Sequence, residues 1–283
     1  MRPLVVKGTK KNRGLVWEPV PNVTHGPDEV LVNVQATAVN RADLLQARGG
    51  YNPPPGASDI LGLEMAGIIA AVGEDVEEWQ VGDRVCALLP GGGYAEQVVV
   101  PAGMLLKLPK SWTFAMGTAV PEVWYTAYVN LFLEGDLVAG ETVLIHAGAS
   151  GVGTAAIQLA NAAEATVFIT AGREEELLAC RKLGAELAIN YKQEDFLEKV
   201  LAVTQDQGVD LILDPVGGGY LDRNVRVLKR FGRLVNIGQL GGSHGEMNMG
   251  LVLGKRLKII GSTLRSRSPA EKEKITEQFK AGY

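Results

Sequence analysis

The sequence has little cysteine, no excess of basic charge and no long apolar run, and each absence excludes a class of protein. Its 283 residues include only two cysteines, Cys86 and Cys180, far apart and without paired spacing. A disulfide framework and a four-cysteine zinc lobe are therefore excluded. The formal net charge of −4 argues against a nucleic-acid partner or an anionic membrane surface, because both require a concentrated basic patch.

No stretch of about 18 apolar residues occurs, so no transmembrane helix is expected. The first residues, MRPLVVKG, also lack the apolar core of a signal peptide. We therefore expect a cytoplasmic protein without a membrane partner.

Two domains are expected, because 283 residues with 46% hydrophobic content are long for a single core. The first 110 or so residues contain short alternating or apolar runs separated by glycine and proline, such as 29–40, 65–73 and 83–89. This pattern predicts a barrel-like β domain, interrupted by helices over 41–48 and 114–133.

From residue 141 the pattern changes to alternating strands and helices. The predicted strands are 142–147, 165–171, 185–191, 209–215, 233–238 and 257–262, with helices such as 154–164 and 174–184 between them. Six strands with crossovers predict an α/β fold with a doubly wound parallel sheet. The last residues, 268–283, are charged and helix-prone.

The first strand of this series leads into HAGASGVGTAA at 146–156, which is typical of a dinucleotide-binding turn. Gly148 and Gly153 occupy the first and third glycine positions, and Ser150 occupies the second. Serine is small, and its hydroxyl can donate to a phosphate oxygen. The helix that starts near Gly151 presents free N–H groups to a pyrophosphate.

The end of the next strand bears on the choice of cofactor. An NAD site places Asp or Glu there to bind the ribose 2′-hydroxyl, but this chain has Ala171 and Gly172. Arg173 can pair with a 2′-phosphate, which favours NADPH over NADH. Glu174, Glu175 and Glu176 follow at once, and they equally fit the acidic first turn of a helix.

Motifs along almost the whole chain resemble the zeta-crystallin-like quinone oxidoreductases of the medium-chain dehydrogenase/reductase superfamily. Within them the chain is most similar to the subgroup of the tumour-suppressor-inducible quinone oxidoreductase. The motifs that carry the resemblance are NRADLLQARGGYNPPPGASDILGLEMAG (40–67), VGDRVCALLPGGGYAEQVVVP (81–101), PEVWYTAY (121–128), LIHAGASGVGTAAIQLA (144–160), TAG (170–172), LGAELAINYKQEDF (183–196) and LRSRS (264–268).

The resemblance implies a GroES-like β-rich catalytic domain over 1–118, a Rossmann NADPH-binding domain over 119–262 and a C-terminal return segment over 263–283. It implies zinc-independent hydride transfer from NADPH to a quinone in a cleft between the domains, by a homodimer or homotetramer.

The resemblance also implies a set of site residues. Asn40 and Tyr51 would line the substrate cleft near the nicotinamide. The residues implied to bind cofactor are Thr126, Ala149, Ser150, Gly151, Val152, Gly172, Arg173, Tyr191, Gly238, Gln239, Leu264 and Arg265. From the residues alone, Asn40 and Asp43 equally fit a helix N-cap pair, and a loop tyrosine such as Tyr51 can serve packing.

Two departures from the family matter. The family has a lysine that grips the 2′-phosphate where this chain has Glu176, so Arg173 would have to substitute or the preference for NADPH would weaken. The family also continues past LRSRS with further elements, whereas this chain ends at Tyr283, which implies a C-terminally shortened member.

A metal-free reaction is expected, because GLE at 62–64 stands where zinc-dependent relatives carry a ligand-bearing GHE. We interpret Glu64 as structural and His146 as a core imidazole with satisfied hydrogen bonds. The alternative functions are an NADPH-dependent enoyl or alkenal reductase, a non-catalytic, crystallin-like NADPH-binding protein, and an unstable fragment.

Overall fold

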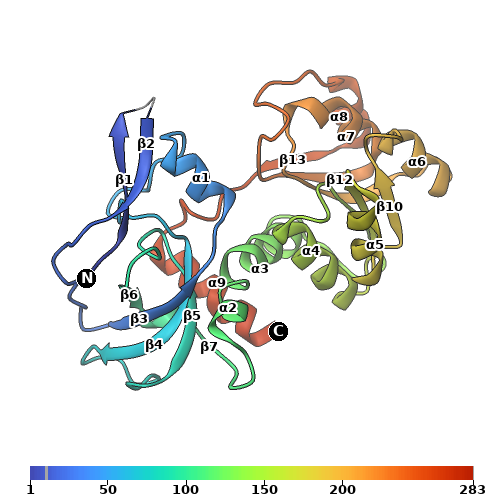
Figure 1. Ribbon diagram of the computed structural model, residues 1–283. Helices are drawn as coiled ribbons and strands as arrows, with labels where there is room; N and C mark the ends of the chain where they lie inside the picture. Colours follow the sequence, from blue (N-terminus) through green and yellow to red (C-terminus); the bar gives the residue numbers. More distant parts are fainter. Residues whose placement is uncertain (10–11, 283) are drawn as a thin grey trace. The chain divides into compact units, whose positions relative to one another are not determined.

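The computed structural model describes residues 1–9 and 12–282 and divides into two units of contacting residues. The first unit comprises 1–125 and 265–283, and the second comprises 126–264. The C-terminal segment thus returns to the first unit, and the second unit begins within a helix. Each unit is described by itself (Figure 1).

The first unit is built on an antiparallel sheet of five strands in the order β6-β3-β4-β5-β7, with a separate β1–β2 hairpin. The strands are β1 (Leu4–Thr9), β2 (Asn12–Trp17), β3 (Glu29–Thr37), β4 (Glu64–Val72), β5 (Arg84–Leu88), β6 (Gln97–Pro101) and β7 (Leu105–Lys107). The helices are α1 (Arg41–Ala47), the 3₁₀ turn η1 (Ala102–Met104), α2 (Phe114–Gly117), the start of α3 (Pro121–Tyr128) and α9 (Pro269–Gly282).

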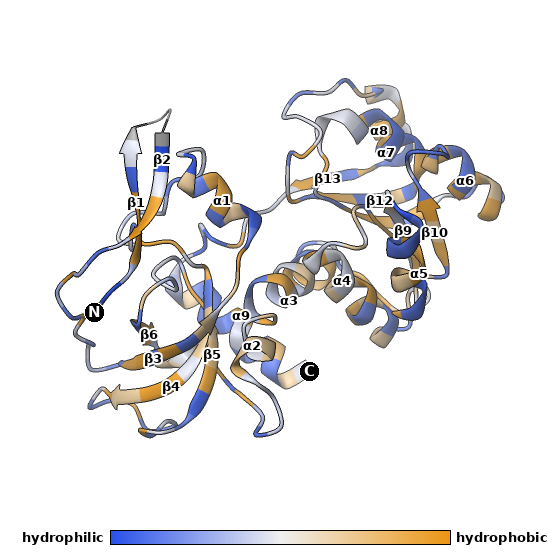
Figure 2. Cartoon of the chain, viewed as in Figure 1, coloured by the Kyte–Doolittle hydropathy of each residue, from blue (hydrophilic) through white to orange (hydrophobic). Residues whose placement is uncertain are grey.

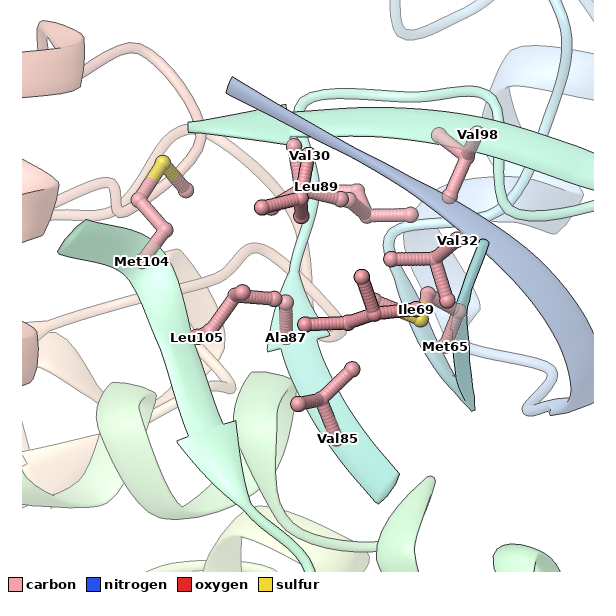
Figure 3. Packing of buried hydrophobic residues seen from close by; sticks show 11 residues of the cluster. Val30, Val32, Met65, Ile69, Val85, Ala87, Leu89, Val98, Met104 and Leu105 are labelled. Carbon is pink, nitrogen blue, oxygen red and sulfur yellow. The ribbon is translucent and has the colours of Figure 1, made fainter. Parts of the chain in front are cut away.

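Alternation along these strands sends every second side chain into one core. Val30 and Val32 of β3 meet Met65 and Ile69 of β4 and Val85 of β5 there, and all five are almost fully buried (Figure 3). The β-rich character expected of the N-terminal part is confirmed.

The second unit contains a parallel sheet of six strands in the order β10-β9-β8-β11-β12-β13. The strands are β8 (Thr142–Ile145), β9 (Thr166–Ala171), β10 (Leu187–Asn190), β11 (Val209–Asp214), β12 (Leu228–Asn236) and β13 (Lys258–Gly261). The helices are η2 (Val129–Leu133, a π-helix), α4 (Gly151–Ala162), α5 (Glu174–Lys182), α6 (Phe196–Val203), the 3₁₀ turn η3 (Gly218–Tyr220), α7 (Leu221–Val227) and α8 (Met249–Lys255).

Helices α4 and α5 cover one face of this sheet, and α6, α7 and α8 cover the other (Figure 1). Strands buried on both faces are apolar along their length, as Figure 2 shows for much of the sheet. The strand order reverses between β8 and β11, which is the point at which doubly wound folds bind their ligands. The predicted doubly wound fold is confirmed.

One predicted helix is interrupted. The stretch 114–133 forms α2, α3 and the π-helix instead of one continuous helix. Thr113 caps α2 through its side chain, and Pro121 starts α3, where its missing N–H costs nothing. No helix in the described ranges is long and apolar enough to cross a bilayer.

Candidate dinucleotide and acceptor sites

The turn after β8 is built around two glycines that backbone crowding requires. A Cβ atom on Gly153 would lie 2.5 Å from the carbonyl oxygens of both Ala147 and Gly148. A Cβ on Gly148 would lie 2.7 Å from the Cβ of Ile169 on β9. Both distances are far below van der Waals contact, so α4 packs this closely on the strands only with glycine at these positions.

Ser150 is the N-cap of α4, and its Oγ accepts a hydrogen bond from the Gly153 N–H at 3.0 Å. Its hydroxyl proton is not used by that bond. Ser150 and Gly151 are exposed, and the N–H groups of Gly151 and Val152 find no acceptor among the described residues. Ala149, half-buried, completes the turn. A twelve-residue helix with free N–H groups at its start suits an anion.

The end of β9 carries a carboxylate that comes from helix α5. Glu176 Oε2 accepts from the Gly172 N–H at 3.1 Å, and its Oε1 accepts from Arg173 Nε at 2.9 Å. Arg173 also forms an ion pair with Glu175 at 2.7 Å. The hydrogen bond from Arg173 lowers the pKa of Glu176, so this carboxylate is ionised at neutral pH. The guanidinium predicted to bind a 2′-phosphate is therefore shared between two carboxylates.

Tyr191 lies beside Gly172. A Cβ on Gly172 would be 2.9 Å from the Tyr191 hydroxyl oxygen and 3.1 Å from Cε of Lys192. Tyr191 is 47% exposed, and Lys192 is also exposed. Sequence reasoning missed Lys192, although it directly follows Tyr191. It brings a cation next to the strand end where Arg173 is already paired.

Four other predicted cofactor residues lie in the second unit. Thr126 is half-buried on α3, and its carbonyl accepts from Asn130 Nδ2 at 2.7 Å. Gly238 and the exposed Gln239 follow β12, where the Gly238 carbonyl accepts from Asn236 Nδ2 at 3.1 Å. Leu264 is buried and is the last residue of the second unit.

A buried chain of hydrogen bonds joins the strand ends of the second unit. His146 bonds through Nδ1 to Thr170 Oγ1 at 3.1 Å and through Nε2 to Asn224 Oδ1 at 2.8 Å. Asn224 Nδ2 donates to Asp214 at 3.1 Å, and Asp214 accepts from the N–H groups of Val216 and Gly217. Burial lowers the pKa of His146, so it is neutral. The prediction of a satisfied core imidazole is confirmed.

In the first unit, Asn40 and Asp43 form the predicted pair at the start of α1. The Asn40 N–H donates to Asp43 Oδ2 at 2.8 Å. The Asn40 side chain donates to Glu64 Oε1 at 2.7 Å, while Glu64 Oε2 accepts from the Glu122 N–H at 2.9 Å. Glu64 therefore bonds a backbone group and Asn40. Burial raises the pKa values of Asp43 and Glu64.

Tyr51 and Arg265 lie together in the first unit. The Arg265 guanidinium carbon is 5.2 Å from the centroid of the Tyr51 ring, and burial raises the pKa of the Tyr51 hydroxyl. Arg265 is only 7% exposed. Its Nε donates to the Pro90 carbonyl at 2.9 Å, and its Nη2 donates to Gln46 Oε1 at 2.7 Å. The structure thus places Arg265 beside the predicted substrate residue Tyr51.

Two protein-family models match the chain. The alcohol dehydrogenase GroES-like domain matches residues 26–110, and the zinc-binding dehydrogenase model matches residues 151–280. The crystal structure of CurK enoyl reductase is 31% identical with a TM-score of 0.86, and the alignment covers 99% of this chain and 87% of that one. The chain belongs to the medium-chain dehydrogenase/reductase superfamily.

Other similar proteins are named for different activities. The structure of Escherichia coli quinone oxidoreductase complexed with NADPH is 28% identical with a TM-score of 0.83, covering 99% of this chain and 86% of that one. The phenolphthiocerol synthesis polyketide synthase type I Pks15/1 of Mycobacterium bovis is 38% identical over 229 residues. That match covers 80% of this chain, which spans 11% of the length of the synthase.

The chain therefore has the nicotinamide-dinucleotide-binding fold of this superfamily. Its residues fit such a cofactor: the glycine cradle, Ser150 and the start of α4 suit the pyrophosphate. Zinc does not fit, although one matching model is described as zinc-binding. Within 1–9 and 12–282 no three His, Cys, Asp or Glu side chains are grouped to hold a metal ion.

Proposed function

We propose that the chain is a zinc-independent reductase that uses NADPH to reduce a quinone or a related electron-poor carbonyl compound. The half-buried Tyr51 ring under the buried Arg265 guanidinium carries this proposal. An aromatic face with a planar cation beside it suits a flat, conjugated acceptor with a carbonyl oxygen. A bound nicotinamide supplies the hydride, and the chain orients the acceptor and excludes water.

We propose NADPH as the cofactor, with only a modest preference over NADH. Tyr191, Lys192 and the missing acid at Ala171 support NADPH. The carboxylate of Glu176 opposes it, because it lies at the strand end and occupies Arg173. Membership of the zeta-crystallin-like subgroup, with a cytoplasmic location, belongs to the same proposal.

A homodimer is part of the proposal as well. β13 is at the end of its sheet, so its outer backbone edge has no neighbouring strand within that sheet. Its Ile259 is 41% exposed. Exposed strand edges with apolar side chains are stabilised by pairing with a second copy. The mass in solution tests this directly, and a monomer over a wide concentration range would contradict it.

Reduction of an enoyl thioester is the second candidate. The similarity to CurK enoyl reductase and to the mycobacterial polyketide synthase favours it. A quinone and an enoyl thioester both have a carbon–carbon double bond conjugated with a carbonyl group. The Tyr51–Arg265 pair suits either one, so the acceptor must be identified by turnover.

The test is oxidation of NADPH with a panel of quinones beside crotonyl thioesters, using wild-type protein and Tyr51→Ala. We expect faster turnover with quinones and a loss of kcat/KM in the variant. Turnover of thioesters alone would establish the second candidate. NADPH binding without turnover of either class, unchanged in Tyr51→Ala, would show a non-catalytic binding protein.

A further inference from the structure

Arg265 holds a buried nitrogen that has no partner. Its Nε and Nη2 donate to Pro90 and Gln46, but Nη1 has no hydrogen-bond acceptor within the part of the chain that the structure describes. Arg265 is buried, with only 7% of the residue exposed. A buried charged donor without an acceptor is costly, and such groups mark places where a ligand oxygen binds.

Carboxylates lie near Arg265, but their hydrogen-bonding capacity is directed elsewhere. Asp43 accepts from the N–H groups of Asn40 and Gly62. Glu64 accepts from Asn40 and from the Glu122 N–H. No ion pair joins Arg265 to an acid among the described residues. Arg265 Nη1 therefore remains a buried donor that no acceptor among the described residues satisfies.

Glu122, in the first turn of α3, is a titratable carboxyl group that interacts electrostatically with Arg265. Burial raises its pKa to about 8, and the charges of Glu64 on β4 and Asp43 on α1 add to that rise. Arg265 and Lys272 on α9 oppose it. Lys272 is buried, and its Nζ donates to the Arg265 carbonyl at 2.8 Å. At neutral pH Glu122 is therefore mostly a neutral acid.

We propose that Arg265 Nη1 binds the carbonyl oxygen of a planar conjugated acceptor lying on Tyr51, and that the charge of Glu122 acts on this binding. The acceptor class rests on the proposed function. The partial negative charge of a carbonyl oxygen is attracted by the guanidinium and repelled by any ionised carboxylate nearby. Because the Glu122 pKa is about 8, acceptor binding weakens as the pH rises through that value.

The probe is duroquinone, a fully substituted quinone that cannot add to thiols, and its affinity for the cofactor-free protein is measured by calorimetry. We expect wild-type affinity to fall several-fold between pH 7 and pH 9. Glu122→Gln, which cannot ionise, should bind equally at both pH values. Glu74→Gln, an exposed acid in the turn after β4, should keep the wild-type dependence.

Arg265→Met should weaken duroquinone binding about tenfold at pH 7, as expected for one lost charge-assisted hydrogen bond. Arg265→Lys keeps the charge but loses the planar guanidinium, so its affinity for duroquinone should lie between those of wild type and Arg265→Met. If one of the two variants fails to fold, the other still tests the site. Unchanged affinity in either Arg265 variant, or a pH dependence retained by Glu122→Gln, would overturn the site. Arg265-dependent binding without any turnover would instead overturn the proposed function alone.

Discussion

Replacing Glu176 should raise the preference for NADPH, because its carboxylate occupies both the strand end and Arg173. Glu176 Oε2 is 3.1 Å from the Gly172 N, and Oε1 is 2.8 Å from Arg173 Nη2. Glu176→Gln removes the negative charge and releases the guanidinium from this ion pair. Glu176→Lys adds a cation where the resembled family carries one.

The size of the effect follows from the charges. A 2′-phosphate carries nearly two negative charges at neutral pH. Because Arg173 and Glu175 are 63% and 70% exposed, solvent weakens each charge interaction at this strand end. We therefore expect Glu176→Gln to raise the ratio of kcat/KM for NADPH over NADH by about fivefold. Glu176→Lys should raise it by about 50-fold, because it changes the local charge by two.

The assay compares NADPH and NADH titrations at low and high salt, with duroquinone as the acceptor. Glu174→Gln is the matched control, because Glu174 is on the same helix but pairs with Arg181 at 3.8 Å. It makes the same charge change and should leave the ratio within about twofold. If Glu174→Gln and Glu176→Gln gave equal shifts, Glu176 would have no specific place at the ribose.

The further predictions concern stability. Gly153→Ala should cost about 2–3 kcal/mol in urea unfolding and weaken NADPH binding, because its Cβ meets two backbone carbonyls. Gly254→Ala, a helical site with no atom within 4 Å, should be neutral or stabilising by about 0.5 kcal/mol. Burial lowers the pKa of His146, which is therefore neutral in the folded protein. The free energy of unfolding that His146 contributes is complete above about pH 6.5 and declines as the pH falls, because the unfolded state then takes up a proton. The stability difference between wild type and His146→Gln should therefore shrink from pH 7 to pH 5, and a constant difference would contradict this. Arg233→Met should cost about 2–4 kcal/mol by thermal unfolding, because the largely buried guanidinium forms two short bonds to Glu141; a loss below about 0.5 kcal/mol would refute it.

The parallel sheet could be predicted from the sequence because its strands are covered on both faces. Runs such as 142–147 and 209–215 are mostly apolar, and they contain β8 and β11. Only the second part of β12 was predicted, because the strand starts at Leu228 and the predicted strand starts at 233. Its first half is polar, and Phe231 takes a positive φ of 66° where the register with β11 shifts.

The local parts of the candidate site could also be predicted. The N-cap role of Asn40 with Asp43 and the turn at Ser150 follow from spacing over three or four residues. The hydrogen bond from Arg173 to Glu176 is equally local. The same residues also fit a solvated acidic first turn of a helix, so the sequence alone does not distinguish the two arrangements.

The long-range parts could not be predicted. His146 meets Asn224 across 78 residues, and Arg265 meets Gln46 across 219. Such pairs depend on how strands and helices are arranged in space, and no periodicity in a single sequence encodes them. For the same reason Glu122 was not a candidate, since its neighbours Glu64, Asp43 and Lys272 come from three other elements.

The most direct test of the central claim is steady-state oxidation of NADPH by the purified, metal-free chain with duroquinone and with crotonyl thioesters. We predict NADPH-dependent turnover of the quinone that a chelator does not inhibit and that Tyr51→Ala reduces. Absence of NADPH oxidation with every acceptor, by a protein that melts cooperatively and is stabilised by NADPH, would contradict it.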